Sequence, residues 1–386
     1  MPRPGVTLDR AGRVYGTTGS LGPYGGGTVF RLTHGSGGWT QNILHSFPDP
    51  SQGGHDGDIP VASVTFGPDG NLYGTTLEGG LGYGTVYKLS PPPSVCKTAL
   101  CPWVETILYQ FSGGSDGKTP NGPVIFDQAG NLYGITGEGG TADEGVVYEL
   151  SHSQSGWTES VLHSFTGAPD GKSPTLNLLF DSAGNLYGTT YFGGTAANQC
   201  GTVFELIPSG SGWTESLPYS FPLTTDGCNP VGLVLDASGN LYGSTNNGGP
   251  NNEGTIYELV NSAGSWTYNQ LYAFPDLHFG IEPNGPLTFD ASGNLWGTTY
   301  LGGIDDCGGP DPGCGTVFEL LHSNGQWSFV TVHEFDSDSN GSNPVGAVAF
   351  DSAGDIYGAT NYGGSNGGSC DSGDLFGCGV IFEITP

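Results

Sequence analysis

The chain has 386 residues, of which only 8 are Lys or Arg and 37 are Asp or Glu, so its formal net charge is −29. So few basic side chains cannot neutralise a run of phosphates, which excludes nucleic-acid binding and disfavours anionic membrane surfaces. The 71 glycines follow no Gly-X-Y period, which excludes collagen, and no long apolar run predicts a membrane span.

One phrase, Gly-Asn-Leu-Tyr-Gly-Thr-Thr, recurs along the whole chain. Its aromatic position falls at seven residues, 54 to 61 positions apart: Tyr15, Tyr73, Tyr133, Tyr187, Tyr242, Trp296 and Tyr357. A period of roughly 57 residues indicates a repeat architecture in which each copy is one structural unit.

Each copy divides into four short β-like segments, A to D. Around Tyr187, segment A is 176–180, segment B is 185–190, segment C is 202–206 and segment D is 213–221. The Asp-x-x-Gly turn between A and B is short, so these segments pair antiparallel. Segments A to C are apolar on both faces and can be buried only between neighbouring sheets. The sequence therefore predicts an all-β fold, a seven-bladed β-propeller with mostly four antiparallel strands per blade.

We expect a single β-propeller domain over residues 1–386. Its approximate blades are 1–52, 53–115, 116–169, 170–226, 227–279, 280–339 and 340–386. The seventh copy ends at its third segment, 380–384, so the last blade is expected to lack its outer strand. The first residues, 1–10, enter segment A directly and contain no apolar signal region, so we expect an upstream extension carrying a fourth strand and an export signal.

The eight cysteines lie mostly in Gly-rich loops. Three sets are near neighbours in sequence, and Cys200 and Cys228 occupy a B–C loop and the next D–A loop: Cys96, Cys101, Cys200, Cys228, Cys307, Cys314, Cys370 and Cys378. An even number in such loops favours disulfides, including one between Cys200 and Cys228, and hence an oxidising compartment. Free thiols or a zinc site are the alternatives, but the gaps exceed the usual spacing of zinc ligands.

The repeated phrases resemble the GloVer tandem-repeat family of bacterial proteins. The similarity rests on Gly-Asn-Leu-Tyr-Gly-Thr-Thr, the Gly-Gly that follows, Gly-Thr-Val-Phe-Glu-Leu and Trp…Leu-His-Ser-Phe, and it covers essentially the whole chain. The resemblance implies export to the extracellular space, the cell surface or the periplasm. It implies no particular activity.

Residues that recur in every copy are interpreted as structural. An Asp opens each A–B turn, where it is expected to bond its own backbone. His45, His163 and His333 share one segment-D position with tyrosines in the other copies, which favours packing. No catalytic motif occurs, so no catalytic residue is predicted.

Two features are not repeated and are the candidate sites. The B–C loops of copies six and seven are long, and their carboxylates could hold Ca²⁺, although they could equally be solvated: Asp305, Asp306, Asp311, Asp371 and Asp374. Tyr191, Tyr300 and Tyr362 follow segment B and could stack on sugar rings; the alternative is packing at the rim.

These observations predict an exported, monomeric binding module that recognises a glycan or a protein through its rim loops, with no cofactor beyond Ca²⁺. One alternative is a propeller enzyme, a lyase or lactonase-like hydrolase with a metal at the channel mouth. Another is a structural repeat protein of the cell surface.

Overall fold

A computed structural model describes residues 5–20, 22–48, 56–92, 102–195, 199–210, 212–222, 225–303, 313–336, 340–364 and 378–385. The chain is all-β and folds as a seven-bladed β-propeller of antiparallel sheets, as the repeat predicts. It divides into two compact units, the first built from Val6–Phe165 with Asp351–Ala353, the second from Thr166–Phe350 and the residues from Gly354 onward.

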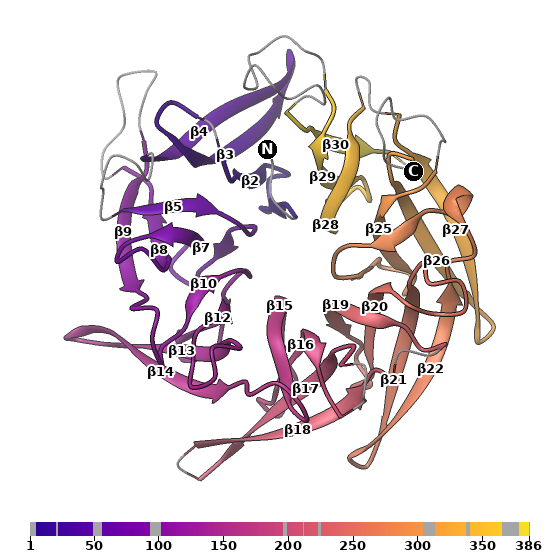
Figure 1. Cartoon of the computed structure of the whole chain (residues 1–386). Coiled ribbons are helices and arrows are strands. Elements are labelled where there is room, and N and C mark those ends of the chain that lie inside the picture. The colour runs from indigo at the N-terminus through magenta and orange to yellow at the C-terminus, as the bar shows by residue number, and fades with distance from the viewer. Residues whose placement is uncertain are drawn as a thin grey trace. The chain divides into compact units, whose positions relative to one another are not determined.

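Unit 1 contains blades one to three, which follow one another in chain order (Figure 1). Blade one consists of β1 (Thr7–Leu8), β2 (Val14–Thr18), β3 (Gly25–Gly35) and β4 (Gly38–Pro48). Blade two consists of β5 (Gly57–Pro60), β6 (Thr65–Phe66), β7 (Leu72–Gly79), β8 (Thr85–Ser90) and β9 (Val104–Gln110). Blade three consists of β10 (Lys118–Pro120), β11 (Ile125–Phe126), β12 (Leu132–Glu138), β13 (Val146–Ser153) and β14 (Gly156–Ser164).

Unit 2 contains blades four to seven. Blade four consists of β15 (Gly171–Phe180), β16 (Leu186–Gly193), β17 (Thr202–Ser209) and β18 (Gly212–Ser220). Blade five consists of β19 (Cys228–Leu235), β20 (Leu241–Asn247), β21 (Thr255–Ser262) and β22 (Ser265–Ala273), and a 3₁₀ turn, η2 (Leu277–Phe279), follows it. Blade six consists of β23 (Ile281–Pro283), β24 (Thr288–Phe289), β25 (Leu295–Leu301), β26 (Thr316–Ser323) and β27 (Gln326–Glu334). Blade seven has three described strands, β28 (Ser342–Phe350), β29 (Ile356–Tyr362) and β30 (Ile381–Ile384).

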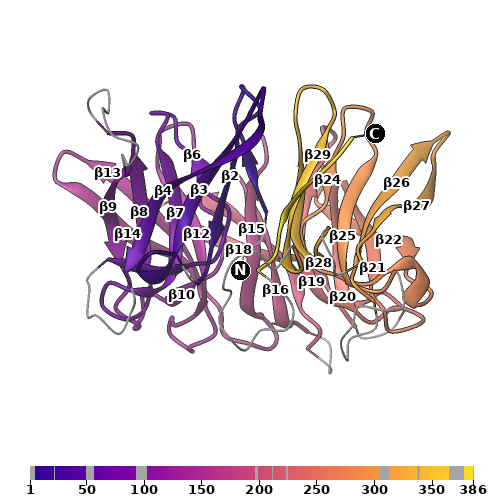
Figure 2. The ribbon, with the colours of Figure 1, turned by 90° about the horizontal axis from the view of Figure 1, so that it is seen from above.

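The predicted segments A to D correspond to the strands of blades one to six, and segments A to C to those of blade seven; Figure 2 shows the blades side-on. Segment A is interrupted in blades two, three and six, where it forms two short strands that pair with the same neighbour. In blades four, five and seven it is continuous but shifts register, for instance between Thr175 and Leu179. Such irregularities bend the strand without ending it. Blade seven has no fourth strand among the described residues, which agrees with the prediction.

The residues of the repeated phrase each make a specific contact within the blade. The turn Asp accepts backbone N–H groups, as Asp181 does from Asn185 at 2.9 Å, and the phrase Tyr donates its hydroxyl to the same carboxylate. The Asp residues are therefore structural, as expected. The phrase Gly is required because the aromatic ring of the third strand lies over it: a Cβ on Gly297 would stand 2.5 Å from the ring of Phe318.

Adjacent blades pack through apolar cores and a few buried hydrogen bonds. Within unit 1, the hydroxyl of Thr75 donates to the carbonyl of Gly122 in the next blade at 2.9 Å. Within unit 2, Thr298 makes the equivalent bond to Gly346 at 3.1 Å. The Phe at the end of the fourth strand is fully buried and, where the next blade belongs to the same unit, contacts the third-strand ring of that blade, as Phe221 contacts Tyr257 at 5.2 Å. Within the described residues, no helix is long and apolar enough to cross a membrane.

Candidate functional site

The five candidate calcium ligands all fall outside the described residues. Asp305, Asp306 and Asp311 precede the described segment that begins at residue 313, and Asp371 and Asp374 precede the one that begins at residue 378. The calcium site therefore stays a prediction.

The disulfide predicted between two loops is present. Cys200 and Cys228 are bonded across a Cα separation of 4.6 Å, and both are buried. The bond ties the loop after β16 to the first residue of β19, so it joins blades four and five. Cys314 and Cys378 are also disulfide-bonded. The remaining four cysteines lie outside the described residues: Cys96, Cys101, Cys307 and Cys370.

The three candidate ligand-binding tyrosines do not share one register. Tyr191 directly follows Thr190, which pairs with Thr202, and Tyr300 directly follows Thr299, which pairs with Thr316. Tyr362 pairs with Ser342 and so corresponds to the residue after Tyr191 in blade four. Successive side chains on a strand point to opposite faces, so Tyr362 does not extend the surface that contains Tyr191 and Tyr300.

The structure adds a group of amides around Tyr191 that the sequence analysis missed. We call Tyr191, Asn229, Asn246 and Asn247 the asparagine network. The Tyr191 hydroxyl donates to Oδ1 of Asn246 at 3.2 Å, and Asn247 Nδ2 donates to the same oxygen at 2.8 Å. Asn229 Nδ2 donates to the Tyr191 carbonyl at 2.8 Å. These bonds connect β16 with β19 and β20 and fix the side chains in one arrangement.

Asn229 lies in a conformation that few residues adopt. Its φ is 62° and Pro230 follows it, although a residue before proline normally stays extended. The same positive φ before a proline occurs elsewhere in the repeat, so this conformation does not depend on the Asn side chain; the other residues are Ile59, Thr119, Ser173, Glu282 and Asn343. The backbone N–H of Asn229 donates to the Cys200 carbonyl at 2.8 Å, which holds the unusual geometry in place.

The same arrangement recurs at the junction of blades six and seven. Asn343 has a φ of 56° and precedes Pro344, and its Nδ2 donates to the Tyr300 carbonyl at 3.1 Å. The sequence pattern that could have predicted this Asn–Tyr hydrogen bond is an Asn-Pro pair that follows, one blade later, an aromatic residue near the end of a second strand. Asn-Pro alone is typical of an ordinary turn, which is why it was missed.

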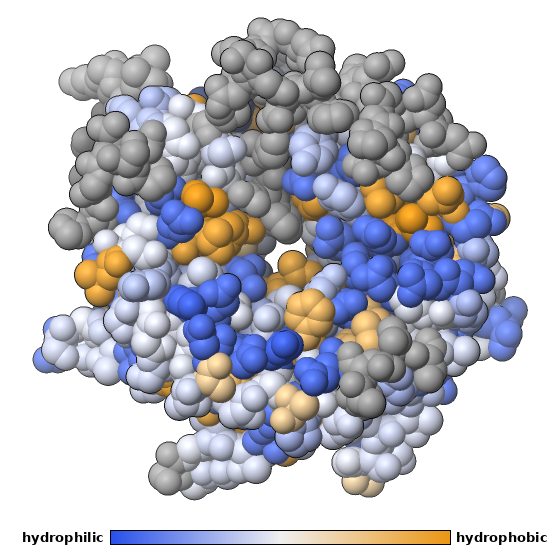
Figure 3. Space-filling view, viewed as in Figure 1, coloured by the Kyte–Doolittle hydropathy of each residue, from blue (hydrophilic) through white to orange (hydrophobic). Residues whose placement is uncertain are grey.

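Apolar side chains lie on loops and strand ends of the same unit. Phe192, Leu277 and Phe279 are between 37% and 44% exposed, and Lys172 Nζ stands 5.6 Å above the Phe192 ring. On the face shown in Figure 3, hydrophilic residues gather over the region of β20 and β25, with hydrophobic residues beside them.

A second candidate group consists of neighbouring carboxyl groups whose pKa values are shifted in opposite directions. In unit 1, Asp116 accepts hydrogen bonds from the Ser112 backbone at 2.7 Å and from the Tyr109 hydroxyl at 3.1 Å. Burial alone would raise the pKa of Asp116, but these bonds outweigh it and lower the pKa. Burial, with a contribution from the Asp116 charge, raises the pKa of Glu159 to about 7. One member of the pair is thus ionised at a pH where the other still holds a proton.

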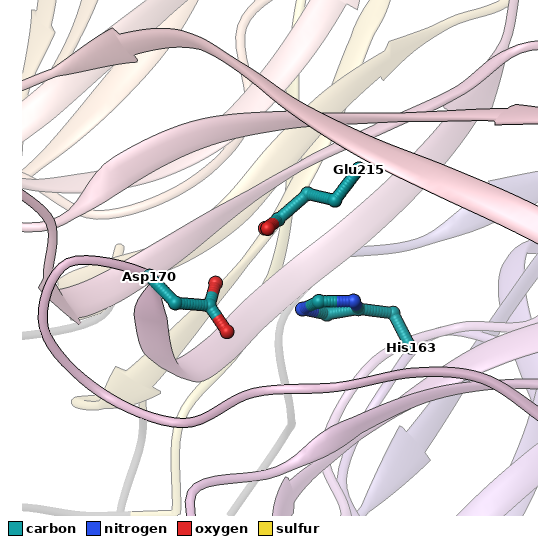
Figure 4. A group of neighbouring side chains, drawn as sticks. All are labelled: His163, Asp170 and Glu215. Carbon is teal, nitrogen blue, oxygen red and sulfur yellow. The ribbon is translucent and has the colours of Figure 1, made fainter.

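The equivalent carboxylates of unit 2 are Asp170 and Glu215. Their carboxylate groups approach each other within 4.8 Å, and Figure 4 shows both side chains turned toward the space between them. Asp170 precedes β15 and accepts from the Thr166 backbone N–H at 3.0 Å. Figure 4 also draws His163, which belongs to unit 1.

Among known proteins, the Gloeobacter/Verrucomicrobia repeat model matches residues 95–310. No curated protein matches the sequence. One similar solved structure is a "putative 6-phosphogluconolactonase" from Bacteroides uniformis, with 15% identity, coverage of 85% of each chain and a TM-score of 0.53. Another is PorZ, a surface component of the type-IX secretion system of Porphyromonas gingivalis, with 13% identity, coverage of 92% of this chain and 45% of that one, and a TM-score of 0.47. At these identities the likeness concerns the fold alone.

Proposed function

The chain belongs to the Gloeobacter/Verrucomicrobia repeat family, and on that premise we propose that it is an exported binding module for a glycan or protein ligand. Its binding surface is the face of unit 2 formed by the asparagine network, Tyr300 and Asn343. The disulfide between Cys200 and Cys228 supports export, since such bonds persist in oxidising compartments.

The observation that carries this proposal is the fixed geometry of the network. An amide presents both donors and acceptors, and adjacent sugar hydroxyls need both. Asn246 and Asn247 are half-buried and already bonded to each other, so little side-chain freedom is lost when a ligand binds. Burial raises the pKa of Tyr191, which keeps its hydroxyl a neutral donor.

The ligand class favoured by these groups is a glycan. Tyr191 and Tyr300 are half-buried rings at equivalent strand positions, and each has an Asn amide bonded to its carbonyl. A ring supplies apolar contact for a sugar face and its neighbouring amide supplies directional bonds.

A glycan array probed with the purified protein, with and without calcium, tests the proposal. We expect at least one glycan class to bind saturably, and Tyr191→Ala and Asn246→Ala each to weaken binding by about tenfold or more, the effect typical of a central contact. Thr267→Ala is the matched control, because Thr267 is exposed on the fourth strand β22, away from the network.

Two results would contradict the proposed surface. One is a glycan array and a pull-down from extracellular protein that both stay blank with and without calcium. The other is a ligand whose affinity is the same for the wild type, Tyr191→Ala and Asn246→Ala, provided that circular dichroism shows both variants folded.

A further inference from the structure

The disulfide between Cys200 and Cys228 lies directly against the asparagine network. Cys228 immediately precedes Asn229 on β19, and it pairs with Asn247 on the neighbouring strand β20. The carbonyl of the other half-cystine, Cys200, accepts the backbone N–H of Asn229 at 2.8 Å. One covalent bond therefore fixes the loop that follows β16 against two of the four residues of the network.

The same disulfide is also connected to the strand that carries Tyr191. Cys200 forms an isolated β-bridge with Gly193, which ends β16, and the N–H of Gly201 donates to the Gly193 carbonyl at 3.1 Å. Asn229 Nδ2 in turn donates to the Tyr191 carbonyl at 2.8 Å. The two half-cystines are only 2% and 8% exposed, so the bond is shielded from reductants once it has formed.

The side chains of the network are held together by neutral hydrogen bonds, some of them long. The Tyr191 hydroxyl donates to Asn246 at 3.2 Å, and Asn247 Nδ2 donates to Oδ1 of Asn229 at 3.4 Å. Such bonds contribute little net stability, because water offers the same groups alternative partners. Tyr191, Asn246 and Asn247 are half-buried, so their arrangement depends on the backbone segments that carry them.

The junction of blades six and seven shows which part of this geometry needs no disulfide. Asn343 has the same conformation before a proline, with a φ of 56°. Ser342 stands at the position of Cys228, so the Asn-Pro conformation forms without a cross-link from this position. The two junctions differ in the paired residue: Cys228 pairs with Asn247, a member of the network, whereas Ser342 pairs with Tyr362.

We propose that the disulfide between Cys200 and Cys228 is the positioning element of the binding surface, and that the surface binds its ligand only after this bond has formed. The inference rests on the proposed function and adds the regulation of that site. Thiol–disulfide exchange with an oxidised dithiol of the export compartment forms the bond. The two cysteine thiols lose two electrons and two protons, and the disulfide of the oxidant takes them up and becomes two thiols. In a reducing compartment the bond does not persist, so the chain binds weakly until it is exported.

The test removes the bond by combining Cys200→Ala with Cys228→Ser, since blade seven already has a Ser at the second position. We expect the signals of this variant on the glycan array to fall by about tenfold or more relative to the wild type, the cost of ordering two freed side chains when a ligand binds. Phe335→Leu is the matched control. Phe335 is fully buried and contacts Phe382 at 5.2 Å, so its substitution lowers stability without touching the network. Below its melting temperature this control should bind like the wild type.

Hydrogen exchange of two backbone amides separates positioning from general stabilisation. The N–H of Asn229 and the N–H of Asn343 donate to equivalent carbonyls, those of Cys200 at 2.8 Å and Cys314 at 2.7 Å. In the variant without the disulfide, the Asn229 amide should exchange about tenfold faster than in the wild type, while the Asn343 amide keeps its wild-type rate.

Three results would overturn this inference and leave the proposed function standing, provided that the wild type binds on the array. The variant without the disulfide could bind as strongly as the wild type. Both amides could exchange faster by the same factor. The variant could lose its fold by circular dichroism, which would show that the bond serves the fold rather than the binding surface. A wild-type array that stays blank with and without calcium would overturn the proposed function, and this inference with it.

Discussion

Two blade junctions of the same construction are filled in different ways. Between blades two and three, Tyr109 faces the carboxylates Asp116 and Glu159. Between blades four and five, Tyr219 donates to the equivalent Asp226, but the place of Glu159 is taken by Tyr268, which stacks on the Tyr219 ring. The same backbone position therefore accepts either a charge or a ring. The comparison shows that one fourth-strand position, held by Glu159 in one junction and by Tyr268 in the other, accepts either kind of side chain. We expect the residue at this position to determine the local stability of the junction and its response to pH.

The largest expected effect is common to both junctions. Phe111 and Phe221 are fully buried and contact the third-strand rings Tyr148 and Tyr257. Phe111→Ala and Phe221→Ala should each lower the free energy of unfolding by about 3–5 kcal/mol, because each leaves a cavity between two blades. Urea denaturation measures both. A much smaller loss at one of them would show that the two junctions are not packed alike.

The second prediction separates the junctions. Tyr268→Ala removes ring contacts with Tyr219 and Tyr257 and a 2.6 Å hydrogen bond to the Asp226 carbonyl. It should cost about 2–4 kcal/mol in the same urea experiment. Glu159→Ala should cost clearly less, since it removes no ring and relieves a buried carboxylate. Equal losses would contradict the view that ring and charge contribute differently.

The third prediction concerns pH. The pKa of Glu159 is raised from 4.5 to about 7, so between these values the folded protein holds a proton that the unfolded chain has released. The contribution of Glu159 to stability is therefore fully present below pH 4.5 and is lost as the pH rises through 7. Glu159→Gln should raise the melting temperature by about 1–2 °C at pH 8 and leave it unchanged at pH 4.5.

The control for this pH prediction lies in the other junction. Tyr268→Phe removes a hydroxyl but no carboxylate, so its effect on the melting temperature should be the same at both pH values. A pH-independent effect of Glu159→Gln would contradict the assignment of the raised pKa to this residue.

The fold followed from the sequence because its signals are local. The Asp-x-x-Gly turn, the phrase aromatic residue that bonds to that Asp, and the Gly beneath the third-strand ring all lie within one copy. They recur in the seven copies with two variations: the second turn is Gly67-Pro-Asp-Gly70, and the sixth phrase has Trp296. Periodicity then implied the number of blades. The disulfide between Cys200 and Cys228 was predictable because the repeat placed both cysteines in loops of neighbouring copies.

The candidate site could be predicted only in part. Tyr191 and Tyr300 stood out as aromatic residues at strand ends, but their amide partners come from other blades. Tyr191 and Asn246 are 55 residues apart and hold equivalent positions in neighbouring blades, but the repeat does not show that their side chains meet. The acidic pairs were missed for the same reason, since Asp116 lies in the turn before β10 and Glu159 lies on β14, 43 residues later, and they meet only when the blade is folded.

The central claim is that the side chains at the Glu159 and Tyr268 positions of the two junctions are interchangeable. The most direct test is the substitution Glu159→Tyr, followed by a crystal structure and a melting curve. The account predicts that the new ring stacks on Tyr109 as Tyr268 stacks on Tyr219, and that the melting temperature at pH 8 rises. A displaced or solvent-exposed ring together with a lower melting temperature would contradict it.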